Sequence, residues 1–196
     1  MATLPTALDA QNAQAAQGLA AIRTWPIERQ QARLLTCCGS SRWAQGMLSM
    51  QTFSDVETLL RQADAIWWQL DEADWLQAFA CHPKIGDIES IRRKYAAQAG
   101  WSLQEQQGVQ GASEAVLRKL ADGNAAYDAK FGFLFLVCAT GKTAGQMLEI
   151  LNTRLPNDRA TEVRVAAGEQ AKITALRLHK WLQEAAQEQV SGAARA

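Results

Sequence analysis

The chain has 196 residues, of which 48% are hydrophobic and 20% are charged. This composition excludes a disordered or a collagen-like chain, and the length fits a single domain. Twenty lysines and arginines balance twenty aspartates and glutamates, so the net charge is zero and we expect no nucleic-acid partner. No apolar run approaches the roughly 20 residues that a transmembrane helix needs, so we expect no membrane partner.

Cysteines and histidines offer few ligands for a metal ion. The four cysteines contain no CxxC pair, and the histidines are His82 and His179. Free thiols in a reducing cytosol are the favoured interpretation, and a zinc site is a weak second. We therefore predict no metal, a cytoplasmic location, and chemistry that depends on organic acids and bases.

Good helix formers fill the sequence between its four prolines, and runs of β-branched residues are absent, which predicts an all-α fold. The apolar spacing predicts helices in chain order over 27–37, 41–50, 54–67, 75–79, 88–99, 113–131, 143–154 and 158–185. We expect an N-terminal extension over residues 1–21, one helical domain over 22–185, and a flexible tail over 186–196.

Local signals predict where several of these helices begin and end. Gly39 is placed to end the first one. Ser54 and Glu57 have the spacing of a capping box. Pro83 disfavours helical geometry at the residue before it, so the helix ahead of His82 must stop there. The apolar stretch 131–139 fits a buried strand or a buried helix, and the helical surroundings favour a helix.

Two adjacent tryptophans, Trp67 and Trp68, lie within one predicted helix. They cannot both point inward, so we expect one of them at an interface or in a groove. The segment ATGKT at 139–143 suggests a phosphate-binding loop, but that motif needs a glycine where Leu136 stands, so it is rejected.

His82, at the forced end of a helix, is the first candidate for chemistry. A histidine that caps backbone carbonyls is the structural alternative. The functional interpretation is a general acid or base, because only histidine has an ordinary pKa near neutrality.

Ser102 and Glu105 form a second capping box, which accounts for both residues structurally. The same carboxylate and the neighbouring Gln106 lie at a helix N-terminus, where an anionic substrate can bind. Arg177 shares a helix face with Ile173 and Trp181. It can extend to solvent or pair with an acid such as Glu169, or its planar guanidinium can bind a substrate carboxylate or ureido oxygens.

Five segments together resemble one enzyme family, the 2-oxo-4-hydroxy-4-carboxy-5-ureidoimidazoline (OHCU) decarboxylases. They are CGSSRW at 38–43, LQAFACHPKIGD at 76–87, WSLQEQ at 101–106, NAAYDAKFGF at 124–133, and the pattern of Glu162, EQAKI and LRL within 162–178. Each motif alone is modest, but the five occur in the right order over residues 22–182.

The resemblance implies a cofactor-free, single-domain helical bundle of the OHCU decarboxylase type. It implies a homodimeric carboxy-lyase of purine metabolism that converts OHCU to (S)-allantoin during the degradation of uric acid. The site residues that it implies are catalytic His82 and Glu105 and substrate-binding Pro83, Ser102, Gln106, Val137, Cys138, Ala139 and Arg177.

His82 and Glu105 are expected to move protons, and one of them protonates a single face of the carbanion that loss of CO2 leaves behind. Orientation matters because OHCU also decays without an enzyme to racemic product. The alternative from another class is a helical interaction domain that has kept this scaffold and lost catalysis. This alternative predicts that charged and polar site residues have been replaced. All five are present, namely His82, Ser102, Glu105, Gln106 and Arg177.

Overall fold

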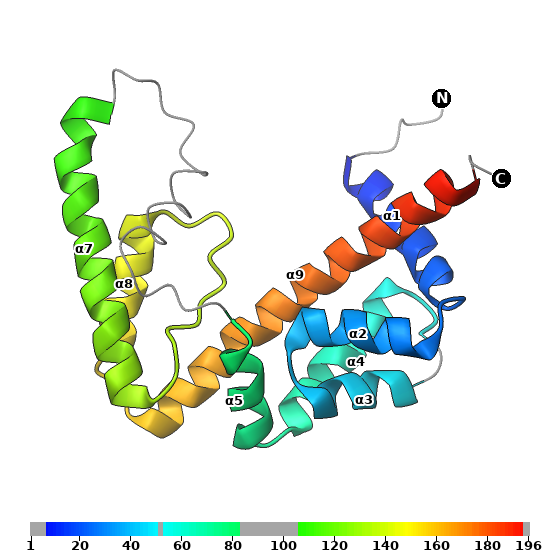
Figure 1. Ribbon diagram of the computed structural model, residues 1–196, viewed down its shortest axis with the longest axis horizontal. Helices are drawn as coiled ribbons and strands as arrows, with labels where there is room; N and C mark the ends of the chain where they lie inside the picture. The colour runs from blue at the N-terminus through cyan, green and yellow to red at the C-terminus, as the bar shows by residue number, and fades with distance from the viewer. Residues whose placement is uncertain (1–6, 51–52, 83–105, 194–196) are drawn as a thin grey trace. The chain divides into compact units, whose positions relative to one another are not determined.

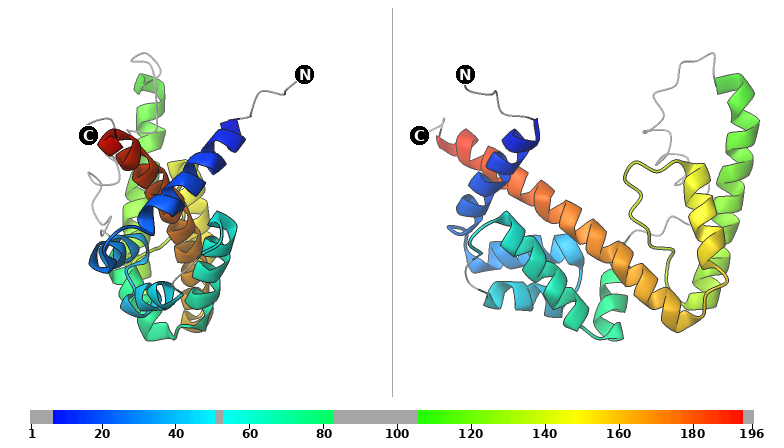
Figure 2. Two further views of the ribbon diagram at one scale, coloured as in Figure 1. Left: turned by 90° about the vertical axis from the view of Figure 1, so that its right-hand side faces the viewer. Right: turned by 180° about the vertical axis from the view of Figure 1, so that it is seen from behind.

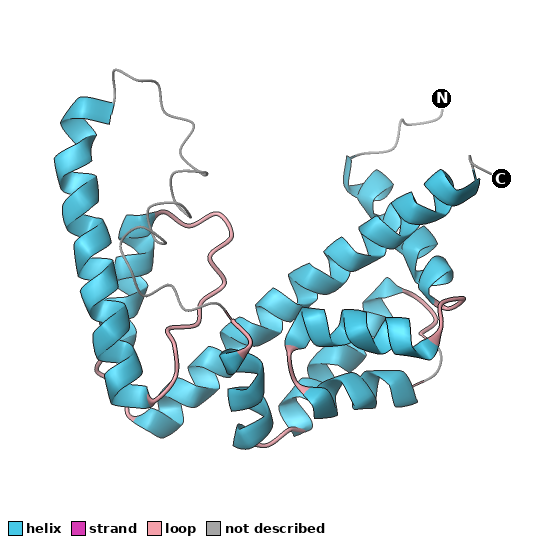
Figure 3. Ribbon diagram, viewed as in Figure 1, coloured by secondary structure: helices cyan, strands magenta, loops and turns pink. Residues whose placement is uncertain are grey.

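The computed structural model describes residues 7–50, 53–82 and 106–193 (Figure 1). Within these ranges every regular element is an α-helix (Figure 3), which confirms the predicted all-α class. In chain order the helices are α1 (Ala7–Ile22), α2 (Ile27–Cys38), α3 (Ser41–Ser49), α4 (Val56–Gln69), α5 (Glu72–Ala80), α7 (Gln106–Phe131), α8 (Ala144–Arg154) and α9 (Arg159–Ala193).

The end of α2 and the start of α3 each follow from one residue; the role of Gly39 was predicted, and that of Ser40 was not. Gly39 has a φ of 90° after the last residue of α2, a left-handed conformation that glycine adopts without strain. The next residue, Ser40, caps α3 by accepting a hydrogen bond of 3.2 Å from the amide of Trp43. The chain therefore turns from one helix into the next within two residues.

The N-terminus of α4 differs from the prediction by one residue. Asp55 is the cap, and its Oδ1 accepts from the amide of Thr58 at 2.7 Å. Ser54, which was predicted to be the cap, donates its hydroxyl to Asp55 Oδ2 at 2.6 Å instead. The carboxylate accepts more bonds at once than a hydroxyl can, and this explains why the cap moves to Asp55.

The preference for a helix over 131–139 is wrong. α7 ends at Phe131, Gly132 follows with a φ of 78°, and residues 132–143 form a loop with no regular structure (Figure 3). The segment stays apolar because Phe133, Leu136 and Cys138 are buried. Its backbone groups bond to side chains rather than to a helix ladder.

The other long helices extend beyond the predicted ends. α7 begins at Gln106, although Gly108 and Gly111 weaken the helical pattern. α9 continues to Ala193, well past the predicted end near 185. None of the described helices combines the length and the apolar character that crossing a membrane requires.

The described chain divides into two compact units, with residues 1–78 and 170–196 in the first and residues 79–169 in the second. In the first, α3 packs against both α2 and α4, around the buried Trp43 and Trp67. The Nε1 group of Trp43 donates to the carbonyl of Ala63 at 2.9 Å. The indole of Trp43 thus links α3 to α4.

The Trp67–Trp68 pair behaves as expected from its position in α4. Trp67 is 2% exposed, whereas Trp68 is 42% exposed. The ring of Trp68 packs edge-on against Trp75, with 5.7 Å between ring centroids. Only one of the two side chains therefore enters the core.

α1 is part of the packed first unit. Ala15, Leu19 and Ile22 are buried, and Gly18 lies so close to α9 that a Cβ there would be 1.8 Å from the carbonyl oxygen of Leu182. The predicted domain boundaries at 21/22 and 185/186 stay predictions.

In the second unit, α7 and α8 lie side by side in every view (Figures 1 and 2). The rings of Phe131, Phe133 and Phe135 surround Tyr127, with centroid distances of 4.6 to 5.7 Å. This aromatic cluster fixes the start of the 132–143 loop against α7.

Candidate active site

The predicted site residues are distributed unevenly over the described structure. Pro83, Ser102 and Glu105 lie outside the described residues. Gln106 is the first residue of α7, and its side chain is outside the described set. His82, Val137, Cys138 and Ala139 belong to the second unit, and Arg177 belongs to the first.

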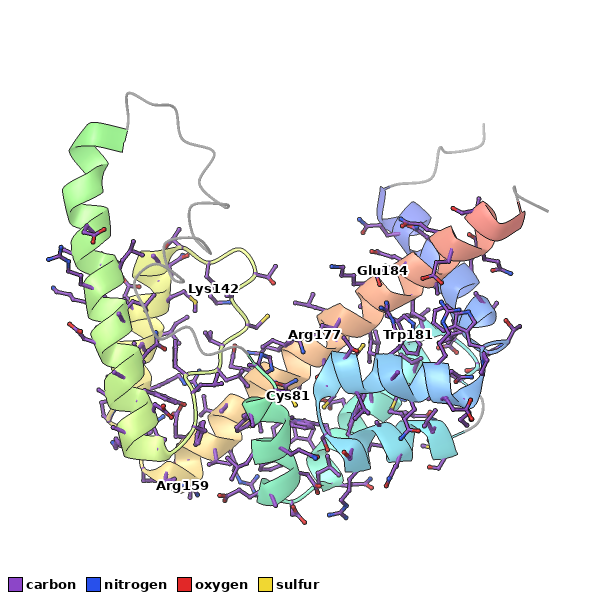
Figure 4. The ribbon with its side chains drawn as sticks, viewed as in Figure 1. Cys81, Lys142, Arg159, Arg177, Trp181 and Glu184 are labelled. Atoms are coloured by element: carbon purple, nitrogen blue, oxygen red, sulfur yellow. The ribbon has the colours of Figure 1, made fainter. Side chains whose placement is uncertain are left out.

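His82 lies in the turn that follows α5. Its amide donates to the carbonyl of Phe79 at 3.1 Å, and its side chain is half-buried. Figure 4 shows the exposed Cys81 directly before it, at the end of α5. The turn is the helix end that the following proline predicts.

Phe79 connects this turn to the 132–143 loop. Its side chain is fully buried, and its ring lies 5.3 Å from the ring of Phe133, centroid to centroid. The structure therefore brings the turn that carries His82 and the loop that carries Val137, Cys138 and Ala139 into one packed unit.

Both backbone groups of Cys138 are bound by charged side chains. The amide donates to Glu169 Oε2 at 2.7 Å, and the carbonyl accepts from Lys142 Nζ at 2.7 Å. The amide of Lys142 in turn donates to the carbonyl of Ala139 at 3.0 Å. The carboxylate of Glu169 thus binds the backbone of the loop.

A buried arginine binds the loop at Leu136, two residues before Cys138. Arg154, at the end of α8, is 5% exposed and donates from Nη1 to the carbonyl of Leu136 at 2.7 Å. Its Nε donates to Glu162 Oε1 at 2.7 Å, and its Nη2 donates to the hydroxyl of Tyr127 at 3.1 Å. One guanidinium therefore joins α7, α8, α9 and the loop.

Glu162 balances the charge of that arginine. Its side chain is fully buried, and its carboxylate also accepts from the hydroxyl of Tyr127 and from Nδ2 of Asn157, the latter at 2.7 Å. Burial, and then the hydrogen bond to Glu162, raise the pKa of Tyr127 far above its usual value. The Tyr127 hydroxyl therefore stays protonated, and it donates to Glu162 while accepting from Arg154.

Arg154 was not among the predicted residues, although the sequence carries a signal for it. Met147, Leu151 and Arg154 are spaced four and three residues apart and are all buried on one face of α8. A charged residue at an apolar position of a helix is informative because it is seldom buried without a partner.

Arg177 is bound to the end of α2 in the first unit. Its Nη1 donates to the carbonyls of Cys37, at 3.2 Å, and of Thr36, at 3.4 Å. A cation favours the C-terminal end of a helix, where carbonyls lack partners. Figure 4 labels Arg177, Trp181 and Glu184 on α9. That Arg177 reaches the same substrate as His82 stays a prediction.

Cys37, next to these carbonyls, is not a reactive thiol. Burial raises its pKa to about 12, and this effect exceeds the opposite influence of Arg33 and Arg177. Among the residues that the structure describes, no three His, Cys, Asp or Glu side chains cluster as ligands for a metal ion would.

Comparison with known protein families identifies the family of this chain. Residues 23–179 match the family model described as OHCU decarboxylase, so this chain belongs to the OHCU decarboxylase family. The match includes every predicted site residue.

The individual relatives agree. The chain is 38% identical over 147 residues to the uric acid degradation bifunctional protein TTL of Arabidopsis thaliana, with 74% of this chain and 44% of that protein covered. It therefore spans less than half of the length of that relative. It is 34% identical over 139 residues to a putative OHCU decarboxylase of Homo sapiens, with 69% and 78% covered.

Solved structures show the same fold. A crystal structure of an OHCU decarboxylase determined in the presence of (S)-allantoin superimposes with a TM-score of 0.59 at 37% identity, covering 74% of this chain and 94% of that one. A crystal structure of an (S)-allantoin synthase superimposes with a TM-score of 0.62 over 83% of this chain and 53% of that one. At 18% identity, the second likeness concerns the fold alone.

Proposed function

We propose that this protein is a carboxy-lyase that converts OHCU to (S)-allantoin in the degradation of uric acid. The observation that carries the proposal is the family match over residues 23–179, which spans all the motifs that supply acid–base and substrate-binding side chains. No cofactor is needed for the reaction, because the substrate itself can accept the electrons that loss of CO2 releases.

The reaction begins with cleavage of the bond between ring carbon 4 and its carboxylate. CO2 leaves, and its bonding pair forms a double bond between ring carbons 4 and 5. The π pair of the adjacent carbon–nitrogen double bond moves onto the ring nitrogen, which takes up a proton. Ring carbon 5, which carries the ureido group, then takes up a proton, and the 4-hydroxyl loses one to become the carbonyl of allantoin. The face on which the proton arrives decides the chirality of the product.

His82 and Glu105 are the proposed base and acid, in either order, for the proton transfers at the 4-hydroxyl and at carbon 5. One of them removes the proton of the 4-hydroxyl, and the other delivers a proton to carbon 5. General acid–base help of this kind contributes about 10²- to 10⁴-fold in rate. The turn that holds His82 supports the assignment, since it leaves this residue half-buried and follows Phe79, whose ring packs on Phe133 of the loop.

The remaining residues are proposed to bind and orient the substrate. Arg177, Ser102 and Gln106 are suited to its carboxylate and ureido groups, and Pro83 follows the catalytic histidine. The backbone of Val137, Cys138 and Ala139 is proposed to lie against the heterocycle. The bonds that fix this loop support a binding role, because a fixed loop loses little entropy when substrate binds.

The experiment that tests the proposal generates OHCU in solution from urate with the upstream enzymes and follows chiral allantoin by circular dichroism. The wild-type protein should accelerate formation of the (S) enantiomer. His82→Ala should lose about 10²-fold or more of that acceleration, and Glu105→Ala should behave similarly. His179→Ala is the matched control, because it removes the second of the two histidines in the chain, which lies in α9.

Two results would contradict the proposal. Full production of (S)-allantoin by His82→Ala would remove the histidine from the mechanism. No acceleration by the wild-type protein would instead favour the inactive interaction domain.

We further propose that the enzyme is a cytosolic homodimer. The 42% exposed Trp68 on α4 supports an additional contact surface. Sedimentation velocity of the wild-type protein should give the mass of two chains. A single-chain mass at micromolar concentration would contradict the dimer.

A further inference from the structure

Two peptide groups flank the Cα atom of Cys138, and each of them makes a hydrogen bond to a charged side chain. Glu169, in α9, accepts from the Cys138 amide at 2.7 Å, and Lys142, at the end of the loop, donates to the Cys138 carbonyl at 2.7 Å. Arg154 adds a third charged contact, at the carbonyl of Leu136. Three charged side chains thus bind a stretch of three consecutive residues (Figure 4 labels Lys142).

A structural requirement explains part of this arrangement. Backbone groups in a buried segment without regular structure need hydrogen-bond partners, and Leu136 and Cys138 are 3% and 8% exposed. Neutral side chains would meet that requirement. Charged partners make hydrogen bonds about twice as strong, so they hold this stretch more tightly than burial alone demands.

The geometry of the peptide bond gives the charges a second effect. The described chain has no cis peptide, and in a trans peptide the carbonyl and the N–H point in opposite directions. The Val137 carbonyl therefore points away from Glu169, and the Ala139 N–H points away from Lys142. Because hydrogen-bonded groups polarise each other, the bond to Glu169 makes the Val137 carbonyl a stronger acceptor. The bond to Lys142 makes the Ala139 N–H a stronger donor.

We propose that Glu169 and Lys142 are positioning residues that hold and polarise the two peptides of Cys138 for recognition of the substrate heterocycle. The class of ligand group that fits is a ring N–H next to a ring carbonyl, which pairs with one backbone acceptor and one backbone donor. This inference rests on the proposed function, since it takes the 137–139 backbone to be the surface that the heterocycle contacts.

The test compares Glu169→Ala, Glu169→Gln and Lys142→Met with wild-type protein in the OHCU assay. Glu169→Ala removes the acceptor and should raise KM about 10- to 100-fold, the range expected for a hydrogen bond to a charged group. Glu169→Gln keeps a side-chain oxygen that accepts from the Cys138 amide but removes the charge that polarises the peptide, so it should recover only part of that loss. Lys142→Met removes the donor to the Cys138 carbonyl and should also raise KM.

Glu149→Ala is the matched control, because Glu149 is an exposed glutamate on α8. It should leave KM unchanged. Thermal unfolding of each variant shows how much folded protein is assayed. The half-buried position of Glu169 favours variants that fold.

The outcomes separate this inference from the proposed function. If Glu169→Ala lowers the melting temperature but leaves KM at the wild-type value, the contact is structural only and the inference is overturned. If Glu169→Gln restores the wild-type KM, the charge does not polarise the peptide. If Glu169→Gln is as impaired as Glu169→Ala, the hydrogen bond to the Cys138 amide does not hold the loop for binding. Either result overturns the inference. If the wild-type protein does not accelerate OHCU decay, both proposals are rejected.

Discussion

The two compact units use their charged side chains differently. In the first, ion pairs between α2 and α9 join Arg29 to Glu188 and Arg33 to Glu184, and these side chains are 35–53% exposed. In the second, the ion pair of Arg154 with Glu162 is 7% and 0% exposed. The first set lies over a core of apolar and aromatic side chains, whereas the second is part of the core.

This difference indicates what each set of charges does. Exposed pairs contribute little because water screens them, so the first unit depends on burial of residues such as Trp43 and Trp67. A buried pair offsets its own desolvation only when its remaining hydrogen bonds are satisfied. Arg154 satisfies one of them with the carbonyl of Leu136, and so the polar core of the second unit also fixes the proposed substrate-binding loop.

The largest effect is therefore expected from separating the buried pair. Arg154→Met leaves the Glu162 carboxylate in the core without its cation, and this should lower the free energy of unfolding by about 3–5 kcal/mol. Urea unfolding followed by circular dichroism measures the change.

The matched control removes both charges. Arg154→Met combined with Glu162→Met should be more stable than Arg154→Met alone, since no uncompensated charge remains. A single variant that loses less than about 1 kcal/mol would place the pair in the class of exposed ion pairs and remove the contrast between the two units.

A smaller effect is expected where α1 meets α9 in the first unit. Gly18→Ala would put a Cβ 1.8 Å from the carbonyl oxygen of Leu182, so the two helices must move apart. Overpacking of this kind costs about 1–3 kcal/mol. Thermal unfolding of the variant measures it.

Gly168→Ala is the control for that substitution. Gly168 also lies within a helix, but nothing lies within 4 Å of its Cβ position. Alanine there should be neutral or should stabilise by up to about 1 kcal/mol through its higher helix propensity. Equal destabilisation by both substitutions would show that α1 does not pack closely on α9.

Local sequence signals were sufficient wherever one residue decides the conformation. Gly39 ends α2 because only a left-handed φ allows the turn, and the end of α5 before His82 follows from the proline after it. The helical periodicity of α4 likewise predicted that Trp67 and Trp68 point in different directions. These features were predicted because their causes lie within a few residues.

The features that were missed depend on residues far apart in the chain. The apolar pattern of 131–139 fits any buried element, and the loop is decided by Arg154 and Glu169, which supply side-chain partners for its backbone. Arg177 was singled out as an unusual cation, yet nothing in its own helix indicates that it binds the carbonyls of Thr36 and Cys37.

A weaker effect is expected for the exposed pair between Arg33 and Glu184. A double-mutant cycle with Arg33→Ala and Glu184→Ala should give a coupling free energy of about 0.2–1 kcal/mol. Coupling should decrease at 1 M salt, where the Debye length is about 3 Å. A coupling as large as that of Arg154 with Glu162 would contradict the comparison.

The smallest effect concerns the cap of α4 and depends on pH. The hydrogen bond from Ser54, followed by those from Thr58, holds the pKa of Asp55 below its usual value. A lowered pKa in the folded state contributes stability above the unfolded pKa of about 3.9. This contribution is lost as the pH falls through the folded value.

Asp55→Asn keeps an oxygen that can cap the helix but cannot titrate. It should therefore be slightly less stable than wild-type protein at pH 7, and the difference should disappear once the wild-type carboxyl is protonated. Asp122→Asn, at an exposed site within α7, is the matched control. If the Asp55→Asn difference persists unchanged to the lowest pH at which both proteins are folded, the charge of Asp55 does not stabilise the helix, and exposed charges matter even less than the comparison of the two units indicates.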